Sequence, residues 1–200
     1  LQIQTDWTDG KDSIEAMAKE AKKQGLEYIV ITDHTRDLAM TGGMDEKKLL
    51  SQMQEIDKVG KKISGITILK GAEVNIRKDG SLDIADEVLS KLDVVGVSVH
   101  SNFKMSTYDM TARIIRAMRN PHVDILFHPT GRLIQKREAY EVDMDAIIAE
   151  AKKTGTVLEI NAFPERLDIK DSDIKKAVEA GCLMAIDSDA HAEEHIGYLK

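Results

Sequence analysis

Short apolar runs alternate with longer amphipathic stretches along the chain. The runs are rich in β-branched and aliphatic residues and lie at 1–5, 28–32, 67–75, 94–99, 123–127, 156–160 and 183–186. Their length and composition predict seven strands. Between them, apolar residues recur three and four positions apart, as at Ile14, Met17, Ala18 and Ala21, and this spacing predicts helices. Because strands that are joined by helices run parallel, the pattern predicts a series of parallel strand–helix units.

Helix-boundary residues support the same division. Asp12 and Ser13 can cap the first predicted helix, and Gly25 can end it before the second strand. Gly155 and Gly181 follow two later helical stretches, each just before an apolar run. No linker or low-complexity tract interrupts the units, so we expect one domain over residues 1–200.

A closed barrel and an open doubly wound sheet both fit seven such units. In a barrel the strand ends all meet at one mouth, whereas the outer strands of an open sheet lie too far apart to form one site. Polar residues that can bind metal follow nearly every predicted strand. This distribution favours an α/β barrel with parallel strands.

The polar residues after the strands are histidines and carboxylates. Of the six histidines, four follow predicted strands, and only His122 and His195 lie elsewhere. The residues that follow strands include His34, Glu73, His100, His128, Asp189 and His191. Imidazole nitrogens and carboxylate oxygens are suited to zinc, manganese and iron, and a bridging carboxylate can hold two such ions close together. The sequence therefore predicts a multinuclear metal centre.

Composition leaves the substrate open. With 42% hydrophobic residues and no run near the roughly 18 apolar residues that span a bilayer, the chain is predicted to be globular, with no membrane partner. No secretory segment is visible and Cys182 is the only cysteine, so we expect a cytoplasmic protein without an internal disulfide. The net charge of -7 disfavours nucleic acid, but two or three divalent ions would offset about four to six negative charges where a phosphate docks.

The successive TDH-, Glu-, SxH-, HP- and SDAH-like segments resemble those of the polymerase and histidinol phosphatase (PHP) family of metal-dependent phosphoesterases. The resemblance covers essentially the whole chain. It implies a distorted, TIM-like (β/α)7 barrel with two or three divalent ions, manganese first and zinc or iron as alternatives. It implies as metal ligands Asp9, His34, Glu73, His100, His128, Asp189 and His191, with Glu73 as a bridge and with Asp9, Glu73, His128 and Asp189 also catalytic.

Four segments, at 5–10, 98–105, 128–133 and 161–168, resemble a narrower group, the C-terminal PHP domain of bacterial and archaeal family X DNA polymerases. This resemblance implies manganese-dependent 3′→5′ exonuclease or related 3′-end processing of DNA. It also implies an upstream polymerase domain in the same chain. The abrupt start within a predicted strand agrees with the expectation that the sequence is a fragment of such a chain.

Gln2 and Gln4 stand where the broad family has His-x-His. An amide oxygen is a neutral and weaker ligand than an imidazole nitrogen. A site that used both positions together with Glu73 and Asp189 would lose its two nitrogen donors. One ion would then bind weakly or not at all, and hydrolysis would be reduced or absent.

Two arginines are predicted to be catalytic because they follow the fifth and sixth strands. Arg132 and Arg166 can stabilise charge on phosphoryl oxygens in the transition state. Arg137, Lys104 and Arg36 have the same potential role with less positional support.

Three further residues have both a structural and a functional interpretation. Asp33 precedes His34 and either orients that ligand or serves the fold. Trp7 and Phe163 flank the predicted mouth and either stack on a base of single-stranded DNA or pack in the core.

The sequence leaves three functions open. The first is a 3′-end DNA nuclease or phosphatase beside a polymerase, and the second is a free-standing phosphatase for a small phosphomonoester such as histidinol phosphate or a nucleotide. The third is a catalytically weak domain that binds DNA or supports a polymerase, and Gln2 and Gln4 are its main support. Metal content and turnover separate the third function from the first two.

Overall fold

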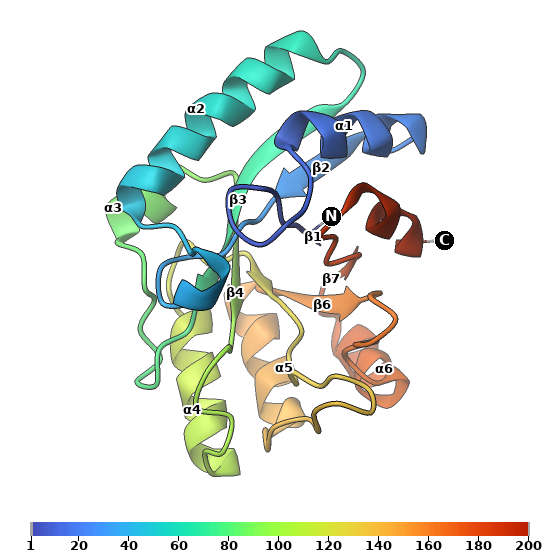
Figure 1. The fold of residues 1–200 in the computed structure, drawn as a ribbon. Helices are drawn as coiled ribbons and strands as arrows, with labels where there is room; N and C mark the ends of the chain where they lie inside the picture. The colour runs from blue at the N-terminus through green and yellow to red at the C-terminus, as the bar shows by residue number, and fades with distance from the viewer. Residues whose placement is uncertain (1, 200) are drawn as a thin grey trace.

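The computed structural model describes residues 2–199 and contains seven parallel strands that neighbour one another in chain order (Figure 1). They are β1 (Gln2–Ile3), β2 (Tyr28–Ile31), β3 (Thr67–Asn75), β4 (Val94–Ser98), β5 (Ile125–Leu126), β6 (Val157–Asn161) and β7 (Met184–Asp187). The segment after β7 pairs with β1, since the Gln4 N–H donates to Ala190 O at 2.8 Å and the Ala190 N–H donates to Gln2 O at 3.0 Å. The sheet therefore curls into a nearly closed barrel, which confirms the predicted fold class.

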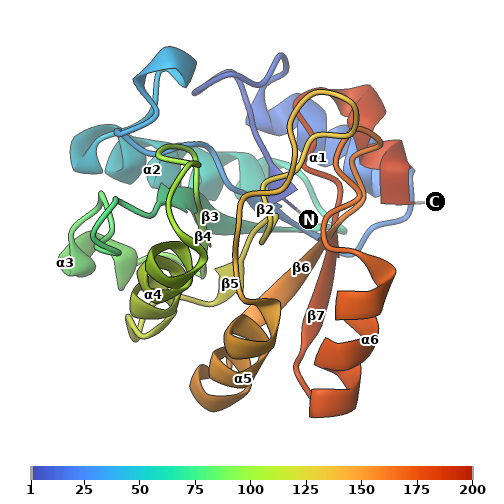
Figure 2. The same ribbon diagram turned by 90° about the horizontal axis from the view of Figure 1, so that it is seen from below.

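Helices connect the strands and lie outside them (Figure 2). They are α1 (Ile14–Lys23), α2 (Glu46–Lys62), α3 (Asp86–Leu89), α4 (Thr107–Met118), α5 (Met144–Thr154) and α6 (Asp171–Ala180), with short 3₁₀-helices η1 (Ala39–Thr41) and η2 (Glu193–Leu199). The Ser13 hydroxyl caps α1 by accepting from the Ala16 N–H, and Gly155 and Gly181 end α5 and α6 in the left-handed conformation. Within residues 2–199, no helix is long and apolar enough to cross a membrane.

All seven predicted strands occur, but two are much shorter than predicted. The run at 1–5 forms only the two-residue β1 in the described part of the chain, and Leu1 lies outside the described residues. The run at 123–127 forms only β5, because Val123 belongs to a turn in which its N–H donates to Asn120 O at 3.1 Å. Both differences are at strand ends, where periodicity is least informative.

The core consists of two hydrophobic clusters. The larger includes Val97 of β4 and Ile147 of α5, and the smaller includes Ile3 of β1 and Ile56 of α2. At Gly96, in the middle of β4, a Cβ atom would overlap the Phe127 ring. This close approach explains a glycine inside a strand, where its flexibility is otherwise unfavourable.

Candidate metal centre

The seven predicted metal-ligand residues lie at the same end of the barrel. Parallel strands point their carboxyl ends to one side, so the loops that follow them meet there. Asp9 comes from the loop after β1, and Glu73 comes from the second half of β3. The other five follow strands β2, β4, β5 and β7 and are His34, His100, His128, Asp189 and His191.

The outer cluster consists of Asp9, His34 and His191. One potential ligand atom from each lies within 4.8 Å of the others. Asp9 Oδ1 is 3.6 Å from His34 Nε2, and Asp9 Oδ2 is 3.8 Å from His191 Nε2. The other ring nitrogen of His191, Nδ1, lies 2.8 Å from the backbone oxygen of Asp189, which fits an Nδ1–H donor and a free Nε2. The outer cluster thus fits a divalent ion, with two nitrogens and a carboxylate.

The inner cluster surrounds Glu73, whose side chain is buried. Glu73 Oε1 lies 2.7 Å from His128 Nε2 and 3.1 Å from His100 Nε2. Glu73 Oε2 lies 3.4 Å from His34 Nδ1, so Glu73 lies between the inner and outer clusters. A neutral imidazole has one lone-pair nitrogen. If His34 Nε2 serves the outer cluster, its Nδ1–H faces Glu73, and Glu73, His100 and His128 remain as an inner ligand set.

The electrostatics of the inner cluster suit metal binding. Burial raises the pKa of Glu73, but the imidazoles of His34, His100 and His128 outweigh burial and hold that pKa well below its usual range. Burial, and then the charge of Arg166, lower the pKa of His128, an effect that Glu73 only partly offsets. At neutral pH the carboxylate is therefore ionised and the His128 imidazole neutral, the states in which both groups bind metal.

Two of the proposed ligands have unusual backbones. His128 and Asp189 have φ angles of 28° and 48°, in the left-handed region that favours glycine. Such conformations cost about 1–3 kcal/mol and gather at functional sites, where surrounding structure imposes them.

Gln2 and Gln4 do not fit a third ion. Both side chains are buried, and both amide groups donate to Glu73 Oε2 from Nε2 at 2.8 Å. Turning either amide over would set its oxygen against the carboxylate, and two acceptors repel. Asp189 is the fourth residue of the expected third-ion site, after Gln2, Gln4 and Glu73. Its Oδ2 accepts from Arg166 Nε at 2.8 Å and from Asn161 Nδ2 at 3.2 Å. Protein donors thus occupy one oxygen of each carboxylate, Glu73 Oε2 and Asp189 Oδ2, that an ion at this position would approach.

Asn75 positions His100, a role that the sequence did not reveal. Its Oδ1 is 2.7 Å from His100 Nδ1, which leaves His100 Nε2 facing Glu73. Asn75 is itself held, because its Nδ2 donates to Asp83 Oδ2 at 2.8 Å and to Thr35 Oγ1 at 3.0 Å. Such partners fix the tautomer and orientation of a histidine ligand. In the sequence, the position of Asn75 at the end of a predicted strand could have indicated this role.

Asp33 holds the loop that carries Asp9. Its carboxylate accepts from the Thr5 N–H at 2.7 Å, from Thr8 Oγ1 at 2.5 Å and from Gln52 Nε2 at 2.6 Å. Burial raises the pKa of Asp33 even though these hydrogen bonds favour its charged form. Of the two predicted roles, these contacts correspond to support of the fold around the ligand loop.

Of the two arginines predicted to be catalytic, Arg132 holds the loop that carries Arg166. Arg132 Nε donates to Arg166 O at 2.9 Å, and its Nη2 donates to Leu167 O. Arg166 is largely buried, and its Nη1 has no hydrogen-bond partner among residues 2–199. Burial opposes the charge of Arg166, but Asp189 and Glu73 hold its pKa above the usual value. Arg132 thus supports the loop that places the positive charge of Arg166 beside Asp189.

Glu159 and Asp187 are buried acids that the sequence reasoning missed. Burial, followed by the charges of Asp187 and Asp189, raises the pKa of Glu159 well above its usual range. The His128 N–H donates to Glu159 Oε2, so this acid supports a proposed ligand through its backbone. Burial also raises the pKa of Asp187. Both lie on apolar strands next to the mouth, a placement that could have signalled them.

The remaining candidates lie around the mouth. Trp7 is partly buried against both core clusters, and Phe163 forms edge contacts with His195 and Tyr198 at ring-centroid distances of 5.2 and 5.3 Å. His195 also accepts from the His191 N–H at Nδ1, at 3.2 Å. Of the less supported cations, Arg36 pairs with Glu46, Arg137 lies over the Phe103 ring and Lys104 is exposed. Stacking on a base remains a prediction for Trp7 and Phe163.

A parallel α/β barrel with two histidine–carboxylate clusters at its mouth has the architecture of a metal-dependent hydrolase. The PHP domain family matches residues 1–163. The chain belongs to the PHP family, whose members are metal-dependent phosphoesterases.

Two relatives illustrate the range of the family. Over 200 residues, the chain is 42% identical to the DNA polymerase/3′-5′ exonuclease PolX of Bacillus subtilis (strain 168) and covers 35% of that protein's length. Over 190 residues, it is 35% identical to a probable phosphatase of Thermoanaerobacter sp. (strain X514), a match that covers 90% of this chain and 73% of that protein.

Two solved structures share the fold. A candidate histidinol phosphatase from Listeria monocytogenes superposes with a TM-score of 0.77 at 16% identity, over 98% of this chain and 96% of that one. A histidinol phosphate phosphatase from Lactococcus lactis subsp. lactis was solved with zinc, L-histidinol and phosphate. It superposes with a TM-score of 0.68 at 14% identity, over 99% of this chain and 89% of that one. At these identities the likeness shows the fold alone.

Proposed function

We propose that this PHP domain is a manganese-dependent 3′→5′ exonuclease, which hydrolyses phosphodiester bonds at the 3′ end of DNA with two divalent ions. The proposal rests mainly on two adjacent clusters of potential metal ligands. His34 Nδ1 of the outer cluster lies 3.4 Å from Glu73 Oε2 of the inner cluster. The match of the whole chain to the B. subtilis polymerase and exonuclease supports DNA as the substrate. It also supports a polymerase domain in the same chain.

Each side chain has a defined part in this proposal. When bound, divalent ions lower the pKa of a water molecule and polarise phosphoryl oxygens. Asp9, His34 and His191 would hold one ion, and Glu73, His100 and His128 the other. Arg166, fixed by Asp189, stabilises negative charge that develops on the phosphoryl group, and Arg132 keeps the Arg166 loop in place. We also propose that Arg132 contacts a phosphoryl oxygen directly.

A small-molecule phosphatase is the second candidate. The Thermoanaerobacter relative is named a probable phosphatase, and this chain covers 73% of its length. The third candidate, a weakly catalytic domain that binds DNA or supports a polymerase, is favoured only by Gln2 and Gln4.

Metal content and strand shortening, measured on the same preparation, test the proposal. We expect about two ions per chain and manganese-dependent release of nucleotides from a labelled single strand. His128→Ala and Asp189→Ala should abolish release. His122→Ala is the matched control, because His122 lies in a turn away from both clusters and should leave release unchanged.

Three other outcomes would each reject the nuclease assignment. Turnover of small phosphomonoesters without strand shortening would support the second candidate. A content of at most one weakly held ion per chain, together with no turnover of either substrate, would support the third. Strand shortening that survives in His128→Ala would point to a contaminating nuclease.

A further inference from the structure

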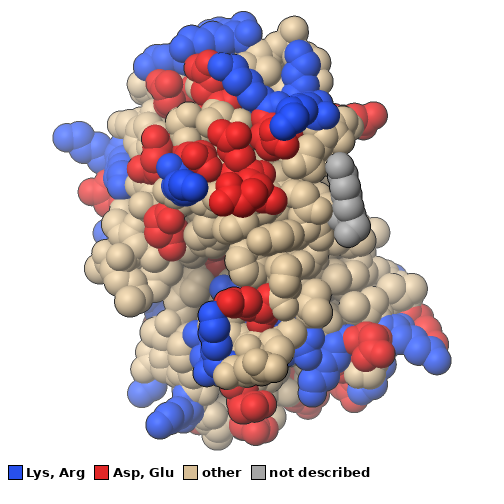
Figure 3. Space-filling view, turned by 45° about the vertical axis from the view of Figure 1, so that its right-hand side comes forward, with Lys and Arg blue, Asp and Glu red and all other residues tan. Residues whose placement is uncertain are grey.

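The charges on the surface are mixed. On the face drawn in Figure 3, lysines and arginines are interspersed with aspartates and glutamates, in keeping with the net charge of -7. A broad basic surface, the usual basis of nucleic-acid affinity, is therefore not what this face offers. On this face, a polyanion would need a local group of basic side chains.

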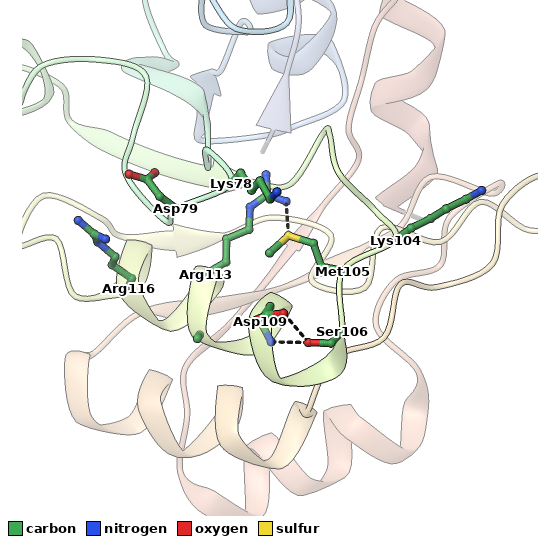
Figure 4. Close-up of a pocket in the computed structure, with 9 residues that line it drawn as sticks. Lys78, Asp79, Lys104, Met105, Ser106, Asp109, Arg113 and Arg116 are labelled. Carbon is green, nitrogen blue, oxygen red and sulfur yellow. Dashed lines mark hydrogen bonds between the residues drawn. The ribbon is translucent and has the colours of Figure 1, made fainter.

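A hollow of about 770 Å³ lies between α4 and the loops that follow β3 and β4 (Figure 4). Lys78 comes from the loop after β3, Lys104 from the loop after β4, and Arg113 and Arg116 from α4. The hollow also contains Asp79 and Asp109. Cationic side chains thus outnumber anionic ones here, in a chain whose overall charge is negative.

The acids of the hollow accept hydrogen bonds from nearby serines, whereas three of its cations form no ion pair in the described part of the chain. Asp79 accepts from Ser81 Oγ at 2.7 Å, and Asp109 accepts from Ser106 Oγ at 2.7 Å. Lys78, Lys104 and Arg116 are exposed and form no ion pair within 4.0 Å among residues 2–199. Their charges are available to a bound anion.

Arg113 makes the walls of the hollow rigid. It is buried, and it donates to Arg77 O from Nε at 2.9 Å, to Ser101 O from Nη1 at 2.8 Å, and to Ile76 O. One side chain thus ties both loops to α4. Gly80 packs so closely that a Cβ atom would lie 2.7 Å from Arg113 O and 2.8 Å from Arg116 Cβ.

His100 of the inner cluster also lines a hollow. A second hollow, of about 180 Å³, is lined by Asn75, His100 and Lys78. Lys78 therefore belongs to both hollows, and Asn75 and His100 belong to the metal centre. We call the two hollows together the cationic groove, with His100 and Asn75 in the smaller, Lys104 and Arg116 in the larger, and Lys78 in both.

We propose that this groove binds the sugar–phosphate backbone of single-stranded DNA, on the 5′ side of the phosphodiester bond that is cleaved. A phosphomonoester is small enough to be held at the metal centre alone, so it would not need the cations of the groove. A polymer would need those cations, because its successive phosphates extend away from the reacting bond. The inference rests on the proposed function, and it specifies a polymeric substrate for the same site.

The test is a triple variant, Lys78→Ala/Lys104→Ala/Arg116→Ala, with Lys47→Ala/Lys61→Ala/Lys175→Ala as its control. The control removes the same charge from exposed positions on α2 and α6. Binding of fluorescein-labelled oligothymidylate is measured by anisotropy at several salt concentrations, in chelator so that no strand is cut. Thermal unfolding verifies that both triple variants fold.

We expect the groove variant to bind the strand about tenfold more weakly or worse, and its salt dependence to fall by about 2 in logarithmic slope, since each phosphate contact of a single strand contributes about 0.7. The control should change binding less than about twofold. With manganese, strand shortening by the parent is measured separately.

Equal losses in both triple variants would overturn the inference, because affinity would then follow net charge alone. Unchanged binding in the groove variant would overturn it as well. Because binding is measured without metal, failure of the groove is distinguishable from failure of the proposed function. The latter would appear as absent turnover with intact, groove-dependent binding.

Discussion

At the scale of single residues, the two oxygens of Glu73 have different surroundings. Oε1 faces imidazole nitrogens of His100 and His128, and Oε2 receives the amide groups of Gln2 and Gln4. Imidazoles can exchange such a contact for a metal ion, whereas an amide N–H cannot ligate one. The sequence showed glutamines at positions where the family has histidines, but only their contacts show that they serve as hydrogen-bond donors to the Glu73 carboxylate.

Restoring the histidines should add an ion. We expect Gln2→His/Gln4→His to bind about one more divalent ion per chain than the parent, because two nitrogen ligands would then face Glu73 and Asp189. Metal analysis after gel filtration in manganese measures the difference. Gln54→His, on the exposed face of α2, is the control and should leave the ion count unchanged. An unchanged count in the double variant would show that the amides are not what excludes the ion.

At the scale of secondary-structure elements, β4 shows how tightly the barrel wall is packed. Gly96 lies against the Phe127 ring, the largest of the fully buried side chains. The residue after Phe127 is the proposed ligand His128, whose backbone N–H donates to Glu159 Oε2. The position of the inner cluster therefore depends on the packing of β4 against the end of β5.

Two glycine-to-alanine substitutions should have opposite effects on stability. Gly96→Ala should lower the free energy of unfolding by about 1–3 kcal/mol, since a methyl group would displace the Phe127 ring. Gly60→Ala, at an open position in α2, should raise it by about 0.5–1 kcal/mol, because alanine is the better helix former. Urea unfolding of both variants measures the two shifts. A loss of stability no larger in Gly96→Ala than in Gly60→Ala would contradict the packing argument.

At the scale of the whole molecule, negative charge gathers inside the barrel mouth. Glu73, Glu159, Asp187 and Asp189 are all buried there, and Arg166 is the buried cation beside them. Charges of one sign that share a desolvated site raise one another's pKa values, as they do for Glu159. Bound divalent ions would offset this repulsion, so metal binding and folding should be linked.

Glu159 makes the stability of the metal-free protein depend on pH. Its pKa is higher in the folded state than the roughly 4.3 expected when unfolded, so the folded protein loses stability as the pH rises from about 4.3 toward the folded-state pKa. Glu159→Gln imitates the protonated acid. In chelator it should match the parent near pH 4 and become more stable than the parent as the pH rises to 8.

Urea unfolding across this pH range measures the difference between parent and variant. Glu179→Gln, an exposed position on α6, is the control and should follow the parent at every pH. A difference between parent and Glu159→Gln that stays constant with pH, or grows toward acid, would contradict the raised pKa.

The order of the elements and the chemistry of the ligands could be read from the sequence, because both depend on local patterns. Apolar periodicity located all seven strands, and the placement of His34, His100 and His128 directly after strands indicated that they converge. The positions of Asn75, Glu159 and Asp187 gave only weak signals, since their significance depends on partners far away in the chain.

Only the tertiary structure decided how those parts meet. The pairing of Gln4 with Ala190 closes the barrel, and the contact of both glutamines with Glu73 joins residues about seventy positions apart. The cationic groove likewise requires Arg113 to bind two loops from different strand ends. Local propensity cannot specify such contacts, because they arise from the register and closure of the sheet and from the packing of α4 against it.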